Sequence, residues 1–134
     1  DYDAAQSFGE DCLAIQRGLG DQREIAWGLA LLSGVAAQQG DYLRAQSFSE
    51  ERLTILREIG GDREIADTLM DLGMVALTQR NLADATLLCE QALATQRELG
   101  DHAGVAYSLL SLGHIHRYQG KYEAARVRYE ESLV

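Results

Sequence analysis

Proline is absent from this chain of 134 residues, so no helix in it can be kinked by a proline ring. The sequence also lacks any run of about 18 apolar residues that could span a bilayer, and nothing at its start resembles a signal peptide. Lysine occurs only at Lys121, whereas arginine is common, which favours a GC-rich bacterial genome. We therefore expect a soluble protein without a membrane partner.

Positive charge is scarce as well. The 12 basic residues are outnumbered by 21 acidic ones, which gives a net charge of -9. Such a surface repels phosphate backbones, so nucleic acid is not expected as a partner, and most of the acids are expected to solvate the outer surface. With 46% hydrophobic residues the chain is long and apolar enough to form one domain with a core.

Motifs for catalysis or cofactor binding are missing too. The sequence contains no nucleotide-binding loop, glycine fingerprint or zinc-type cysteine cluster. His114 and His116 would point about 200° apart on a helix, so they cannot chelate one ion. We expect no enzymatic activity, no cofactor and no metal.

The sequence does contain an internal repeat. An offset of 40 residues aligns the chain with itself from end to end without a gap, and Arg23-Glu24-Ile25-Ala26 returns as Arg63-Glu64-Ile65-Ala66. A fixed period of this length indicates stacked supersecondary units, which form binding scaffolds more often than enzymes. Cys12 and Cys89 lie almost two repeats apart, so we expect no disulfide, in agreement with a cytoplasmic location.

Each period has the pattern of two amphipathic helices. Leu29 and Leu32 belong to the apolar face of the first helix, and Phe48 and Leu53 to that of the second. We expect a second helix alone at 1–19, then helix pairs at 22–59, 62–99 and 102–134. The single domain 1–134 would comprise a half repeat (1–20), two repeats (21–60 and 61–100) and a truncated one (101–134), as expected of a fragment of a larger protein.

Glycine and capping residues mark the ends of these helices. Gly20, Gly60 and Gly100 are placed to end the second helices, because glycine adopts the left-handed conformation without steric cost. Asp21 and Glu24 have the spacing of a capping box at the start of a first helix. Between the two helices of each pair we expect a glycine or asparagine to reverse the chain, at Gly40-Asp41, Arg80-Asn81 and Gly120-Lys121.

These recurring residues resemble the tetratricopeptide repeat, through Leu72-Gly73, Leu112-Gly113, the turns Gly40-Asp41-Tyr42 and Gly120-Lys121-Tyr122, and the alanines Ala45, Ala85 and Ala125. The resemblance implies an all-α, right-handed superhelical array (an α–α solenoid) in which Ser33, Gly73 and Gly113 let paired helices approach closely. The usual period is about 34 residues. The longer period here is similar to that in bacterial transcription regulators, signalling ATPases and animal polarity or motor adaptors, where the array is a sensor or docking arm.

In such arrays the first helices line a concave wall that binds proteins or peptides. The residues that the helical wheel places on or beside this wall are Trp27, Leu31, Asp67, Met70, Asp71, Met74, Tyr107, Leu110, His114, Arg117 and Tyr118. Aromatic, methionine and arginine side chains commonly anchor interfaces, so Trp27, Met70 and Tyr118 are the foremost candidates for ligand contact. The alternative is that these side chains pack between neighbouring first helices.

Two functions follow from this pattern. The first is a scaffold that binds a peptide or protein segment in its concave groove, as the sensing or docking arm of a larger regulatory protein. A peptide C-terminus is not the expected ligand, because Arg117 alone represents the cationic clamp used by some similar arrays. An apolar segment with a basic residue near Asp67 and Asp71 fits better. The second function is self-association through exposed ends, which would set the oligomeric state.

Overall fold

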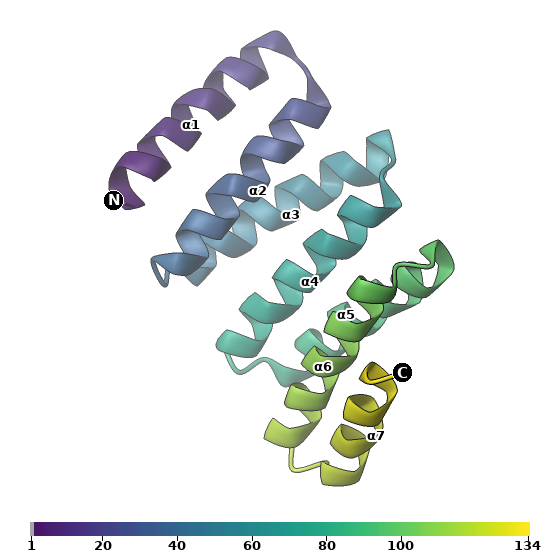
Figure 1. Cartoon of the computed structure of the whole chain (residues 1–134). Helices are drawn as coiled ribbons and strands as arrows, with labels where there is room; N and C mark the ends of the chain where they lie inside the picture. Colours follow the sequence, from purple (N-terminus) through teal and green to yellow (C-terminus); the bar gives the residue numbers. More distant parts are fainter. Residues whose placement is uncertain (1) are drawn as a thin grey trace. The chain divides into compact units, whose positions relative to one another are not determined.

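The computed structural model describes residues 2–134 and, within them, every side chain except that of Leu19. These residues form seven α-helices and no strand (Figure 1): α1 Tyr2–Leu19, α2 Gln22–Gln38, α3 Tyr42–Ile59, α4 Asp62–Thr78, α5 Leu82–Leu99, α6 His102–Tyr118 and α7 Tyr122–Ser132. We call α2, α4 and α6 the first helices, and α1, α3, α5 and α7 the second helices. The expected all-α helical-repeat fold is confirmed, and first helices begin at residues 22, 62 and 102.

The chain divides into two compact units, with the boundary between Thr68 and Leu69 inside α4. Unit 1 contains α1, α2, α3 and the first part of α4. Unit 2 contains the rest of α4 with α5, α6 and α7.

The core of unit 1 forms where α2 packs against both α1 and α3 (Figure 1). Leu13, Ile25, Leu29 and Leu32 are at most 5% exposed and form one cluster, against which Phe48 and Ile55 pack. Burying a leucine or isoleucine side chain stabilises a fold by about 1.5–3 kcal/mol. Ile25, Leu29 and Leu32 are spaced by four and three residues, so all three lie on the same face of α2.

The paired helices approach closely at one recurring position. In unit 1 the hydroxyl groups of Ser33 and Ser49 lie 2.7 Å apart. In unit 2 a Cβ atom added to Gly73 would lie 2.9 Å from Sγ of Cys89, and one added to Gly113 would lie 2.5 Å from the Tyr129 ring. A small residue on the first helix therefore leaves room for a partner of different size on the second, as expected for Ser33, Gly73 and Gly113.

Alanine completes the same contact. Ala45, Ala85 and Ala125 are at most 3% exposed, one in each second helix after α1. Ser33 also donates a hydrogen bond of 3.0 Å to the carbonyl oxygen of Ala45, which shows how near the two backbones lie. A larger side chain at these alanines would force the helices apart.

Side-chain caps begin most of the helices. Asp21 accepts hydrogen bonds from the backbone N–H groups of Arg23 and Glu24. Asp41, Asn81 and Asp101 each accept one from the third residue of the helix that follows. These contacts satisfy N–H groups that have no partner within the helix.

The turns agree with the sequence at the glycines and differ at Arg80-Asn81. Gly20, Gly60 and Gly100 have φ of 72°, 83° and 67° at the ends of second helices, as expected. Gly40 and Gly120 also have positive φ, but the residue that reverses the chain between α4 and α5 is Arg80, with φ of 64°. The expectation for Asn81 is wrong, because its side chain caps α5 and its φ is -83°.

Ion pairs connect successive second helices within each unit. Arg17 of α1 pairs with Glu51 of α3, and Arg97 of α5 pairs with Glu131 of α7 in the equivalent register. Arg128 and Glu90 add a second link between α7 and α5. The side chains are partly exposed, so each pair contributes no more than about 1 kcal/mol.

Candidate functional site

A stripe of exposed side chains runs along α6 in unit 2. Tyr107 is 52% exposed and Tyr118 55% exposed, and His114 is also exposed between them. The spacings of seven and four residues place all three on one side of the helix. The opposite side is buried through Leu109, Leu112 and Ile115, at 0–2% exposed. Two tyrosine rings therefore face solvent on the face that the sequence assigns to the ligand.

The other first helices carry equivalent exposed positions. On α2, Trp27 is 60% and Leu31 48% exposed. On α4, Asp67 and Asp71 are exposed, whereas Met74 is partly buried. Arg117, beside the α6 stripe, is exposed as well. The structure thus presents most of the expected residues to solvent, at the helix positions given by the repeat.

Met70 is an exception. Met70 is not available as the foremost ligand contact that the sequence suggested, because its side chain is 4% exposed and its sulfur lies 3.1 Å from the hydroxyl oxygen of Ser108 of α6. Met70 lies at the edge of the α4 stripe, where α6 covers it. The equivalent residue on α6 is Leu110, which is 42% exposed.

His114 is turned toward the second helix of its own pair. Its Nδ1 lies 3.0 Å from the hydroxyl oxygen of Tyr129, and the two rings pack edge to face with centroids 5.5 Å apart. His116, two residues later, is partly buried and its Nδ1 lies 3.3 Å from Oε1 of Gln119. A ligand that contacts His114 would therefore meet a ring already held in place by Tyr129.

A hollow of about 300 Å³ lies at the end of the α6 stripe, lined by Leu77, Thr78, Arg80 and Tyr118. The Arg80 guanidinium lies 5.7 Å from the centre of the Tyr118 ring, and that of Arg117 lies 6.0 Å from it. Sequence reasoning missed Arg80. The available signal was its repeat position, which is occupied by Gly40 and Gly120 in the other turns.

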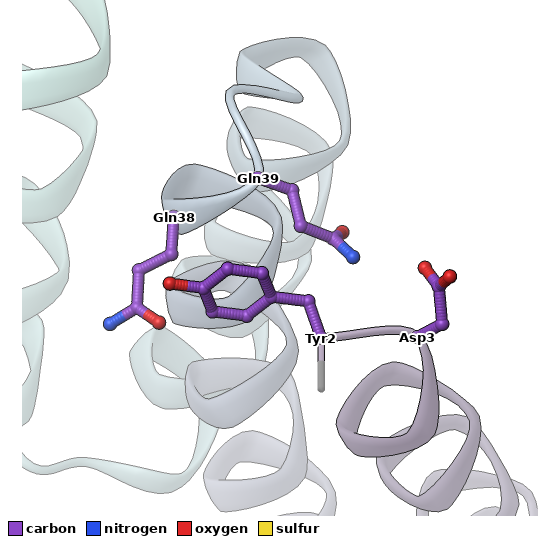
Figure 2. Close-up of a pocket in the computed structure, with 4 residues that line it drawn as sticks. All are labelled: Tyr2, Asp3, Gln38 and Gln39. Carbon is purple, nitrogen blue, oxygen red and sulfur yellow. The ribbon is translucent and has the colours of Figure 1, made fainter.

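A second hollow, of about 400 Å³, lies in unit 1 between the start of α1 and the end of α2. Figure 2 shows the Tyr2 ring extending toward Gln38, with Asp3 and Gln39 completing the lining. Its side chains are polar except for one half-exposed ring, and Tyr2 is 51% exposed. This arrangement has no group that would select a ligand by charge other than Asp3.

The two cysteines differ in their exposure to solvent, since Cys12 is partly exposed and Cys89 is buried. Both cysteines are free, and Cys89 is fully buried. Burial, and to a smaller extent the neighbouring Glu90 carboxylate, together raise the pKa of the Cys89 thiol to about 11. Within residues 2–134, the structure places no three His, Cys, Asp or Glu side chains where they could hold a metal ion. In the same range no helix is long and apolar enough to cross a membrane.

A match to a family model identifies the family of this chain. A tetratricopeptide repeat model matches residues 64–133, which is more than half of the chain. The chain belongs to the tetratricopeptide repeat family. Tetratricopeptide repeats generally mediate protein–protein interaction and are typically not catalytic. The close contacts at Gly73 and Gly113, which sequence analysis attributed to this repeat, lie inside the matched region.

Comparison with solved structures supports the tetratricopeptide-like fold. The chain is similar over 98% of its length to BtubC (BKLC) from P. vanneervenii, whose crystal structure gives a TM-score of 0.91 at 21% sequence identity. The chain spans 55% of the length of BtubC. A search of curated proteins finds no significant match. The likeness to BtubC establishes the fold of this tetratricopeptide repeat chain.

Proposed function

We propose that this chain binds a segment of a partner protein through the exposed face of its first helices. The observation that carries the proposal is the α6 stripe, in which Tyr107 and Tyr118 are more than half exposed on a helix whose other side is buried. Tyrosine combines a large apolar ring with a polar group and is enriched where interfaces gain most of their energy. A face needed only for solubility would carry short polar or charged side chains.

The exposed face of α2 in unit 1 supports the same function. Trp27 and Leu31 are four residues apart, so their side chains lie next to each other on the helix. They are 60% and 48% exposed. Because Trp27 is the only tryptophan in the chain, its fluorescence emission will report a partner that covers this face.

The acidic residues suggest part of the partner's character. Asp71 is exposed on α4 beside the partly buried Met74. An apolar segment with a basic residue near Asp71 would complement this side of the stripe, and a helical or extended peptide could supply it. We place the chain in the cytoplasm as the docking or sensing arm of a larger regulatory protein, in line with its resemblance to long-period arrays of such proteins.

Selection from a displayed library of random dodecapeptides tests the binding function. Peptides that bind the wild-type chain are synthesised, and their affinities are measured by fluorescence polarisation. We expect Tyr118→Ala and Tyr107→Ala to weaken binding by about tenfold or more, because truncation of an interface anchor costs more than about 1–2 kcal/mol.

Tyr122→Ala is the matched control, because Tyr122 is 71% exposed but begins the second helix α7. Circular dichroism should show unchanged helix content in all three variants. Peptides whose affinity falls for Tyr122→Ala and not for Tyr107→Ala or Tyr118→Ala would place the interface on the second helices and contradict the proposal.

Self-association is the second candidate, and α1 provides the observation that favours it. Phe8 and Ile15 are 72% and 65% exposed. Their repeat equivalents in α3, Phe48 and Ile55, pack against the core of unit 1. The face of α1 that carries Phe8 and Ile15 therefore has the composition of a helix-packing surface. Nothing within the described part of unit 1 covers this face.

Sedimentation velocity over a range of concentrations separates the two candidates. If α1 mediates self-association, the wild-type chain forms dimers at micromolar concentration and Phe8→Glu together with Ile15→Glu restores the monomer. A monomer at all concentrations would eliminate self-association. It would leave peptide binding by the first helices unaffected.

A further inference from the structure

Most arginine residues of unit 2 already have carboxylate partners. Arg97 pairs with Glu131, Arg128 with Glu90, and Arg126 with both Glu123 and Glu130. Arg80 and Arg117 differ, because neither forms a salt bridge with any residue that the structure describes in unit 2. In a chain with a net charge of -9, two arginines without carboxylate partners near one ring are an unusual local excess of positive charge.

Both guanidinium groups lie beside the same tyrosine. They are 5.7 and 6.0 Å from the centre of the Tyr118 ring, a distance at which a cation is attracted to the ring face. Arg80 and Tyr118 also line the 300 Å³ hollow, together with Leu77 and Thr78. The hollow therefore combines a fixed cation, an aromatic ring and an aliphatic side chain.

The acidic residues close in sequence to these arginines are engaged elsewhere. Asp84 accepts a hydrogen bond of 2.6 Å from the side-chain amide of Asn81. Glu123 lies 2.9 Å from the guanidinium of Arg126. The cationic side of the hollow thus remains open to a carboxylate from outside the unit.

We infer that this hollow binds an aspartate or glutamate side chain of the partner segment, with an adjacent aliphatic residue packed on Leu77 and Tyr118. The inference rests on the proposed function and defines one position of the partner. A guanidinium can donate two parallel hydrogen bonds to one carboxylate, which fixes its orientation. The negative net charge of the chain disfavours a polyanion such as nucleic acid. A single carboxylate on an apolar segment interacts mainly with the two nearby arginines.

The test uses the dodecapeptides selected on the wild-type chain, synthesised with amidated and with free C-termini. We expect enrichment of Asp or Glu next to Leu, Ile or Val, and equal binding of both terminal forms. Arg80→Gln should weaken binding by roughly tenfold or more, and Arg117→Gln should weaken it in the same direction. Arg126→Gln is the matched control, since it removes the same charge from unit 2 at a site already paired with glutamates.

A double-mutant cycle connects the peptide carboxylate to Arg80. Replacing the peptide's acidic residue by its amide should cause the same loss as Arg80→Gln, and the two changes together should cause little further loss. Independent, additive losses would overturn the inference. Equal weakening by Arg126→Gln would also overturn it, because that result indicates only long-range attraction. Binding of the free C-terminal form alone would assign the carboxylate to a chain end instead.

The outcomes distinguish this inference from the proposed function. If Tyr107→Ala and Tyr118→Ala weaken peptide binding but Arg80→Gln does not, the carboxylate site is refuted. The proposed function then still stands. Failure to select any peptide would count against both. A dimer that dissociates on Arg80→Gln would show that the carboxylate comes from a second copy of the chain, which would overturn assignment to a separate partner.

Discussion

The hydroxyl group of Ser108 on α6 donates a hydrogen bond of 2.6 Å to Oε1 of Gln96 on α5, and both side chains are at most 2% exposed. The repeat equivalents in unit 1 are Gly28 and Gln16. There, Oε1 of Gln16 is buried without a hydrogen-bond partner, and a Cβ atom added to Gly28 would lie 2.7 Å from it. One repeat has a satisfied polar contact between paired positions, and the other has the acceptor without its donor.

Gly28→Ser should supply that donor and stabilise the fold. The Gln16 amide lies at the end of a flexible side chain, so it can shift to accept the new hydroxyl group. We expect the free energy of unfolding to rise by about 1 kcal/mol, from the hydrogen bond and the removal of a helical glycine. Urea unfolding followed by circular dichroism measures the change. Gly28→Ala is the control: alanine is the better helix former, so a serine variant no more stable than the alanine variant would contradict the hydrogen bond.

Ser108→Ala should have the opposite effect. The variant leaves Oε1 of Gln96 buried without its donor, and such a group costs about 1–3 kcal/mol. Urea unfolding of this variant beside wild type measures the loss. The contact would be energetically unimportant if the midpoint did not change.

Gly113→Ala should destabilise unit 2 by about 1–3 kcal/mol, because the new Cβ atom would lie 2.5–2.9 Å from three atoms of the Tyr129 ring. Gly34→Ala is the control, since no atom lies within 4 Å of the added Cβ. That variant should gain up to about 1 kcal/mol of stability from helix propensity. Thermal unfolding compares the two. If Gly113→Ala matched Gly34→Ala, the close approach of α6 and α7 would be disproved.

A rescue experiment uses the serine pair of unit 1. Gly113→Ser combined with Tyr129→Ser recreates the Ser33 and Ser49 contact, in which the hydroxyl groups lie 2.7 Å apart. We expect the double variant to be more stable than Gly113→Ser alone. Additive losses from the two substitutions would show that residue size at this contact is not coupled across the helix pair.

Arg80→Gly should raise stability while it removes the carboxylate site. A left-handed backbone costs a non-glycine residue roughly 1–2 kcal/mol, and Arg80 has φ of 64°. Loss of the cation–π contact with Tyr118 offsets about 0.5–1 kcal/mol of this gain. We expect a higher melting temperature together with weaker binding of acidic peptides. A lower melting temperature would indicate that the arginine side chain stabilises the turn more than its backbone strains it.

Cys89 should react with thiol reagents only after unfolding. Its side chain is fully buried, whereas Cys12 is partly exposed, and the pKa of Cys89 is raised to about 11. Only the thiolate is reactive, so both burial and protonation protect Cys89. Labelling of the native chain with an aromatic disulfide should modify one thiol, and none in Cys12→Ser. Rapid labelling of native Cys12→Ser would contradict the buried position.

The same thiol predicts a loss of stability in alkaline solution. The pKa in the folded chain, about 11, lies above the ordinary value of 9.0, so folding favours the neutral thiol. Its contribution is complete below pH 9 and declines as the unfolded state ionises between pH 9 and 11. Relative to Cys89→Ala, wild type should lose about 2–3 kcal/mol across that range. Urea unfolding at each pH gives the free energy of unfolding of the two proteins. If both free energies changed equally with pH, the pKa of Cys89 would not differ between the folded and unfolded states.

The candidate site shows how far sequence reasoning reached. Helix positions on α6 could be predicted, because Tyr107 and Tyr118 recur at helical spacing and face away from the buried leucines. The sequence could not show that Met70 is buried and that Leu110, its repeat equivalent, is exposed. The two residues occupy the same helix position, but α6 covers only Met70. Arg80 was missed because arginine rarely adopts the left-handed backbone conformation that this turn requires.

The sequence by itself determined the seven helices, their ends and the all-α repeat fold, because helical periodicity, N-terminal caps and left-handed glycines act within a few residues of the chain. The tertiary structure alone decided which side chains of the first helices remain exposed. It also decided that the Arg80 and Arg117 guanidinium groups lie beside Tyr118 without carboxylate partners in unit 2. Burial and ionic pairing depend on residues distant in sequence, and a 40-residue repeat gives equivalent positions the same local geometry but different neighbours.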